Sequence, residues 1–256
     1  MADYKDSFTK ERKELEEFAA KIKDGTYKLE KISMKEEANL PKQQSKVSSK
    51  PVEEESKSSE IKPKGKYKKT LTTLKNGNTY EGEWVGDQPE GEGEEKYSNG
   101  KYVGSFRNGK RHGFGKYVYN DGNTYEGDWV DGEREGRGLF KSSNGGVYYG
   151  GYVDGKPHGL GHKKWADGRS ALGEWRDDKL NGECVHRWPN GDVYVGQFKE
   201  TKMEGKGVYF HNSGDRYEGL WEEGSKHGEG VVTFAGKKQR AIWESGKQKE
   251  VLETWN

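Results

Sequence analysis

The clearest pattern along the chain is an alternation of aromatic residues and glycines that returns every 22 or 23 residues. Counting from Tyr80 as position 0, this position is Tyr in six of seven repeats and Ala171 in the fifth. Position 2 is Gly and position 4 is aromatic in every repeat. Alternate residues of a β-strand point to the same face. Positions 0, 2 and 4 therefore place a ring, a gap and a ring on one face of a short strand.

The seven repeats follow one another in register. They begin near residues 80, 102, 125, 148, 171, 194 and 217, and a degenerate eighth repeat keeps Ala241, Trp243 and Gly246. The residues that we assign to the structural repeat are Tyr80, Gly82, Trp84, Tyr102, Gly104, Phe106, Tyr125, Gly127, Trp129, Tyr194, Gly196, Phe198, Tyr217, Gly219 and Trp221.

A second alternation follows within each repeat and predicts a second strand. Position 11 is always Gly, position 13 is Gly except at Cys184, and position 17 is usually aromatic. A turn is expected near positions 6 to 10. Asn-Gly and Asp-Gly pairs favour two-residue hairpin turns because both residues accept a positive φ. Such turns are predicted where the repeats end, at Asn99-Gly100, Asp121-Gly122, Asn144-Gly145, Asp167-Gly168, Asn190-Gly191 and Ser213-Gly214.

Hairpins that repeat so regularly predict an all-β fold, an elongated single-layer antiparallel β-hairpin solenoid. Each glycine leaves room for a neighbouring ring, so the apolar core is one layer of side chains. Seven hairpins give about 14 strands spaced about 4.8 Å apart. A sheet of that length is expected to twist and to have a concave and a convex side. Ala171 and Cys184 depart from the pattern and put the regularity of the fifth repeat in question.

The segments on either side of the array differ from it in pattern. Residues 1–35 hold an amphipathic helix with Phe8, Leu15, Phe18 and Ile22 on one face, followed by a short extended stretch. This helix folds back on the array, docks on another subunit or forms only transiently. Residues 36–66 are a disordered linker rich in Lys, Glu and Ser.

The array itself is expected to occupy residues 67–246, with caps at both ends. Residues 67–75 predict a first strand that covers the N-terminal edge. Residues 247–256 predict a C-terminal cap, a short helix whose Val251, Leu252 and Trp255 cover the last hairpin. Caps are expected because a bare end exposes rings and unpaired backbone.

Composition supports a thin structure and narrows the class of function. Only 29% of the residues are hydrophobic and 35% are charged, yet the chain has 8 Trp, 15 Tyr and 8 Phe. A net charge of +1 provides no field to attract nucleic acid. The single cysteine excludes a disulfide within the chain. The polar start has no apolar signal core, so a cytoplasmic location is expected.

Residue types that could carry chemistry are explained by the repeat. Gly-x-Gly pairs recur in every repeat and open no helix, unlike phosphate-binding loops. His112, His158 and His227 share position 10 but lie two or more repeats apart, roughly 19 Å or more, whereas zinc ligands lie within about 2.1 Å of one point. Cys184 is expected to be a small buried thiol. We therefore expect no catalytic, metal or cofactor-binding residues and no enzyme.

The repeat resembles a known family. Tyr-Glu-Gly-Glu-Trp at 80–84, Tyr-Glu-Gly-Asp-Trp at 125–129 and Tyr-Glu-Gly-Leu-Trp at 217–221, each followed by Gly-x-Gly, are similar to the MORN repeat over about residues 76–246. The resemblance implies a rod-like hairpin array that serves as a structural scaffold. Stand-alone arrays are similar to radial-spoke head proteins of the ciliary axoneme, so a cytoskeletal or axonemal location is implied. The alternative is a phospholipid-associated protein that recruits partners to a membrane.

The expected partners are other proteins, with a homodimer formed end to end as a further alternative. Residues that break the pattern are the first candidates for binding, namely Phe114 and Leu160 at position 12. The aromatic face and the N-terminal helix are the second and third candidates. The corresponding residues are Trp129, Tyr152, Trp165, Trp175 and Trp188 on the array, and Phe8, Leu15, Phe18 and Ile22 on the helix.

Overall fold

The structure is a computed structural model that describes residues 65–255. Within this range the chain forms one antiparallel sheet of 17 strands. No described helix is long and apolar enough to cross a membrane. The predicted N-terminal helix and most of the predicted linker lie outside the described residues. The strands are β1 (Tyr67–Thr73), β2 (Thr79–Val85), β3 (Gln88–Tyr97), β4 (Gly100–Arg107), β5 (Lys110–Tyr119), β6 (Thr124–Val130), β7 (Glu133–Lys141), β8 (Val147–Val153), β9 (Lys156–Lys164), β10 (Ser170–Arg176), β11 (Lys179–Arg187), β12 (Val193–Lys199), β13 (Lys202–Phe210), β14 (Arg216–Glu222), β15 (Ser225–Phe234), β16 (Lys237–Glu244) and β17 (Lys247–Trp255).

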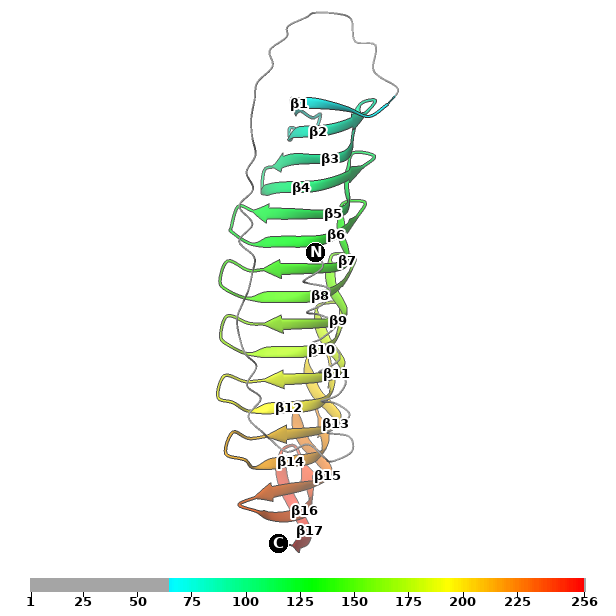
Figure 1. The fold of residues 1–256 in the computed structure, drawn as a ribbon. Helices are drawn as coiled ribbons and strands as arrows, with labels where there is room; N and C mark the ends of the chain where they lie inside the picture. Colours follow the sequence, from blue (N-terminus) through cyan, green and yellow to red (C-terminus); the bar gives the residue numbers. More distant parts are fainter. Residues whose placement is uncertain (1–64, 256) are drawn as a thin grey trace, which may run out of the picture.

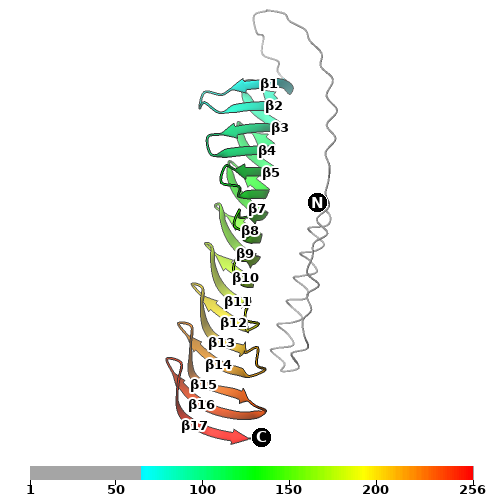
Figure 2. The same ribbon diagram turned by 90° about the vertical axis from the view of Figure 1, so that its left-hand side faces the viewer.

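Each strand pairs with the next strand along the chain, so the sheet is a ladder read in sequence order. Figure 1 shows the strands stacked along the long axis from β1 to β17. Figure 2, turned by 90°, shows a single layer whose strands are bent. Sixteen steps between strands give a length of about 77 Å at about 4.8 Å per step. The predicted single-layer hairpin array is confirmed, with more strands than the expected 14 because β1, β16 and β17 extend it.

A bulge inside each hairpin produces the bend. In the third repeat Gly127 pairs with Gly138 and Trp129 pairs with Arg134, so Asp128 alone lies opposite three residues. Of these three, Gly136 has a φ of 63°, the left-handed region that favours glycine. The Asp128 carboxylate accepts a hydrogen bond of 2.9 Å from the amide of Arg137. The bulge therefore explains the glycine at position 11, and in this repeat the side chain at position 3 satisfies an amide that the ladder leaves free.

Tight two-residue turns lie inside the repeats, and among the repeat ends they occur only after the first repeat, between Tyr97 and Gly100, and after the seventh, at Ala235-Gly236. The prediction of a tight turn at every repeat end is therefore wrong for the others. At positions 6 and 7 of the second to seventh repeats, both residues of the turn have positive φ, as in Asn108 (51°) with Gly109 (73°) and Asp131 (49°) with Gly132 (97°). In the loop that ends the second repeat, four residues separate β5 from β6, only Gly122 is left-handed, and the Tyr119 amide donates to the Asn123 carbonyl. At Asn99-Gly100, Gly100 already belongs to β4. The same dipeptide signal occurs at both kinds of site, so it does not distinguish a two-residue turn from a longer loop.

Both ends of the array are capped by strands. β1 pairs with β2 as predicted, and the Tyr67 hydroxyl donates a 2.6 Å hydrogen bond to the Gly86 carbonyl. The predicted C-terminal helix is wrong, because residues 247–255 form β17 and pair with β16. An unpaired β16 would expose a row of amides and carbonyls, which a further strand satisfies and a helix would not. The degenerate eighth repeat is thus a complete hairpin.

Candidate interaction surface

The sheet has two faces of different character. The ring face carries the side chains of positions 0, 2, 4, 13 and 15, and the hollow face carries those of positions 1, 3, 12 and 14. Buried aromatic residues gather on the ring face. On the hollow face, side chains surround two open hollows. The two faces can therefore be assigned separate roles.

A zipper of perpendicular rings holds the ring face together. Tyr80 packs edge to face against Trp84 of its own repeat (5.3 Å between ring centroids) and against Phe106 of the next (4.9 Å). The same pair of contacts continues through Tyr102, Tyr125 and Tyr148. Edge-to-face pairs contribute about 0.5–1.5 kcal/mol beyond their burial. The zipper therefore joins each hairpin to the next, except between the fifth and the sixth, where Ala171 replaces the tyrosine.

Each tyrosine ring lies over the two glycines of its own hairpin. A Cβ built on Gly127 would lie 2.8 Å from the Tyr125 hydroxyl, and one built on Gly138 would lie 2.5 Å from Cζ of the same ring. The hydroxyl of Tyr125 donates a 3.0 Å hydrogen bond to the Asp128 carbonyl. Burial raises the pKa of Tyr125 far above its ordinary value, so the donor keeps its proton. The rings and glycines are thus fully used in packing.

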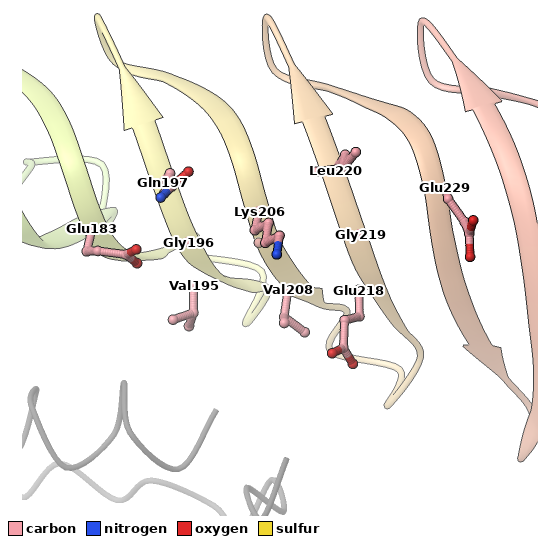
Figure 3. Close-up of a pocket in the computed structure, with 11 residues that line it drawn as sticks. Glu183, Val195, Gly196, Gln197, Lys206, Val208, Glu218, Gly219, Leu220 and Glu229 are labelled. Carbon is pink, nitrogen blue, oxygen red and sulfur yellow. The ribbon is translucent and has the colours of Figure 1, made fainter. Parts of the chain in front are cut away.

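The hollow face is where the array offers space. One open hollow of about 610 Å³ lies over β11–β15, where Figure 3 shows Gln197, Lys206 and Leu220 from neighbouring strands around it. A second hollow of about 460 Å³ includes Arg137 and Leu160 in its lining. Both combine apolar side chains with charged ones. Such a lining suits a segment of another protein that carries both kinds of group.

A continuous row of side chains, apolar except for His162, also runs across the hollow face at positions 1 and 14, and it was not predicted from the sequence. Seven successive strands, β7 to β13, each contribute one side chain, and cross-strand pairing places them side by side. The sequence signal was present, because these residues alternate with the rings along the same strands. We call this set the apolar row: Leu139, Tyr149, His162, Leu172, Val185, Val195 and Val208.

The structure separates the residues that the sequence proposed for partner binding. Phe114 is 38% exposed and, like Leu160, lies on the hollow face. Trp129, Tyr152 and Trp175 are buried in the ring zipper. The remaining residues on the array, Trp165 and Trp188, are half-buried at its edge, while Phe8, Leu15, Phe18 and Ile22 lie outside the described residues. Binding through the aromatic face stays a prediction, and the burial of its central rings favours a packing role for them.

Comparison with protein families finds one match to this array. The family described as MORN repeat matches residues 80–101, 102–124, 125–147, 148–168, 172–193, 194–216 and 217–237. These matches cover more than half of the chain. The chain belongs to the MORN-repeat family.

Comparisons outside the family add little. A comparison with curated proteins finds no match. Among solved structures, the TCP10 domain of Danio rerio CPAP is 12% identical with a TM-score of 0.42, covering 75% of this chain and 96% of that chain. The TCP10c domain of Drosophila melanogaster Sas-4 is 13% identical with a TM-score of 0.32, covering 70% of this chain and 100% of that chain. TM-scores this low do not establish a common fold.

The fifth MORN repeat, which departs most from the pattern, is as regular as the others. β10 and β11 pair through Gly173 and Cys184 with the same bulge before Trp175. Ala171 and Cys184 are both buried, at 1% and 3% exposure. Because no tyrosine ring stands at position 0, position 13 can carry a side chain. The two substitutions thus compensate each other, and the doubt about this MORN repeat is removed.

His186 bridges the gap that Ala171 leaves in the zipper of the MORN array. Its ring lies 4.2 Å from Trp188, 5.8 Å from Trp165 and 6.2 Å from Phe198, measured between centroids. It is 7% exposed, and its Nδ1 atom has no hydrogen-bond partner among the described residues. Burial lowers the pKa of His186 to about 4, with nearby Arg169 acting in the same direction. The neutral ring is therefore the form that the fold accepts.

This buried histidine predicts that the array loses stability in acid. Unfolded His186 takes up a proton as the pH falls through its ordinary pKa of 6.5, whereas the folded form resists until about 4. The stability it contributes is complete above pH 6.5 and has decreased by about 3 kcal/mol at pH 4, at about 1.4 kcal/mol per pKa unit. Urea unfolding at several pH values measures the loss. His186→Tyr, which installs the residue found at this position in two other repeats, should reduce it; an equal loss in this variant would contradict the assignment.

Proposed function

We propose that this MORN-repeat protein is a non-catalytic scaffold that binds segments of other proteins along its hollow face. The observation that carries the proposal is that the two faces of the sheet differ in how their side chains are used. The zipper occupies the ring face, while the hollow face keeps two open hollows of about 610 and 460 Å³. A rigid single-layer array presents such a surface over many repeats, as solenoid proteins do.

The lining of the hollows suggests what kind of segment binds. Leu220 is 38% exposed beside Lys206 on the neighbouring strand, and Glu229 lies across the hollow. Leu160 lies opposite Glu174 on the next strand. Apolar anchors flanked by charges of both signs suit an amphipathic segment with scattered charge, bound by burial of its apolar side. A strongly basic or acidic polymer would find no matching field on this chain.

The setting of the scaffold is also part of the proposal. Stand-alone MORN arrays resemble radial-spoke head proteins, so we place this chain in a cytoskeletal assembly, with the ciliary axoneme as the specific site. This assignment rests on family analogy alone. A tagged chain should then be seen on filaments or axonemes in cells, and a diffuse or membrane pattern would argue against it.

A capture experiment with paired variants tests the scaffold. Leu160→Glu combined with Leu220→Glu puts carboxylates into both hollows, at positions where other repeats already carry Glu, such as Glu92 and Glu83. Recovery of a stoichiometric protein partner from native lysate should fall at least about tenfold, because an anchor becomes an unpaired charge on binding. The matched control is Val85→Glu with Val130→Glu, at the exposed ends of β2 and β6 and outside both hollows.

Two results would count against this function. If the unaltered protein recovers no stoichiometric partner, the scaffold function is contradicted. If both double variants lose the partner equally, the hollow face is excluded as the binding surface. The alternative function is recruitment to a phospholipid surface. A net charge of +1 predicts weak attraction to anionic lipid, and flotation with anionic liposomes at physiological salt distinguishes the two, since a scaffold of proteins stays in the soluble fraction.

A further inference from the structure

The apolar row is confined to the middle of the array. Along the same line of the hollow face, the flanking strands carry mostly charged residues, with Val103 and Val231 as the exceptions. The row thus has a defined beginning at β7 and a defined end at β13. The charged residues on its two sides are Glu81, Glu94, Lys116 and Glu126 toward β1, and Glu218, Arg240 and Glu253 toward β17.

The C-terminal part of the row is also the most buried part of the hollow face. Val195 is 6% exposed, whereas Val103, at the same position of the second repeat, is 45% exposed. Val193 and Phe210 lie beside the row and join it in a cluster separate from the zipper. The described strands form one layer and none of them crosses this face (Figure 2). Apolar side chains that gather on a face crossed by none of the described strands mark a place where another segment packs.

We propose that residues 8–22 of the same chain dock on the apolar row as an amphipathic helix that runs along the array. Phe8, Leu15, Phe18 and Ile22 form its apolar stripe. A helix of 15 residues is about 22 Å long. The row spans six steps between strands, about 29 Å. The helix therefore fits within the length of the row, and its apolar stripe matches the row in chemistry.

The length of the connecting chain favours this occupant over a second copy. Residues 23–66 join the helix to β1. A flexible chain of that length has a root-mean-square span of roughly 33–40 Å. From β1 to the middle of the row at β10 is about 43 Å. A tether whose span matches the distance gives an effective concentration of roughly millimolar, far above that of a free second copy.

Photo-crosslinking in the full-length protein tests the docking. A benzoylphenylalanine placed at Phe18 should, on irradiation of a dilute sample, crosslink within one chain to peptides from β11–β13. The same probe placed at Lys13, on the opposite side of the helix, should give little of that product. A crosslinked dimer would assign the row to a second copy, and crosslinks elsewhere on the array, or none, would also overturn the proposal.

A matched pair of variants decides whether the apolar row is the receptor. Val195→Glu should reduce the crosslink on the order of tenfold, because docking would bury an unpaired carboxylate. The array tolerates this residue, since Glu81, Glu126 and Glu218 occupy the same position in other repeats. Val103→Glu, outside the row, should leave the crosslink unchanged; equal losses would overturn the proposal. Val195 and Val208 also line the hollow over β11–β15, so a docked helix and a captured segment would share this surface. The crosslink needs no external partner, so it reports docking whether or not the capture experiment recovers one.

Discussion

Replacing Gly138 with alanine is expected to destabilise the array by about 1–3 kcal/mol or more, as overpacking of a tight core does. The new Cβ would lie 2.5 Å from Cζ of Tyr125, and the ring has little room to move. Trp129 and Tyr152 hold it from two sides at 5.1 Å each, and its hydroxyl is bonded to the Asp128 carbonyl. The strain therefore reaches the zipper on both sides.

Chemical and thermal unfolding, followed by tryptophan fluorescence, measure this effect. For a domain of this size, each kcal/mol lowers the melting temperature by about 2–4 °C. Gly146→Ala is the matched control, because Gly146 is not left-handed and its nearest atom beyond its chain neighbours, Oδ1 of Asn144, would lie 3.3 Å from the Cβ. That variant should change stability by less than about 0.5 kcal/mol. Equal effects of the two substitutions would show that the ring does not require the glycine.

The second expected result is that the residue pair at positions 0 and 13 of the fifth repeat, Ala and Cys, can replace Tyr and Gly in the third repeat. Tyr125→Ala alone should cost about 3–5 kcal/mol, because it empties a ring-sized site in the core. Gly138→Cys alone should cost at least as much as Gly138→Ala, since its side chain meets the same ring. Together they recreate the pair that Ala171 and Cys184 form. The double variant should be more stable than the sum of the single costs by about 1–3 kcal/mol, within the range of coupling between touching residues.

A double-mutant cycle under reducing conditions measures this coupling. The mismatched control joins Tyr125→Ala to Gly161→Cys, because Gly161 lies under Tyr148 rather than Tyr125. In that control the two costs should simply add. If the matched and mismatched pairs behave alike, the compensation between positions 0 and 13 is refuted, and Cys184 needs another explanation.

Much of the fold follows from the sequence because the ring and glycine pattern is local. Positions 0, 2 and 4 predicted one face of a strand, and the structure confirms that Tyr80 and Trp84 share that face over Gly82. Residues 67–75 were predicted to add a strand, and β1 does so. Each of these features depends on residues within one hairpin. Short-range patterns of this kind carry their own geometry.

Features that depend on neighbouring strands were harder to predict. Val251 and Leu252 are adjacent, so the segment shows little of the alternation that predicts a strand. It forms β17 because the otherwise open edge of β16 offers hydrogen-bond partners to a strand. The ring face was proposed for binding because aromatic content alone does not show whether a ring is exposed. Trp129 and Trp175 are buried by rings of other repeats, and such contacts cannot be deduced from one repeat. The apolar row likewise emerges only when seven strands are aligned.

Because each strand pairs only with its neighbours in sequence, the length of the molecule is set by the number of strands. One further repeat would insert two strands, lengthen the rod by about 9.6 Å and leave every existing contact in place. Lengthening in such fixed increments is the property of a spacer. The number of repeats therefore sets the distance between the two ends. A change in that number would alter the distance that the rod spans without altering how each repeat folds.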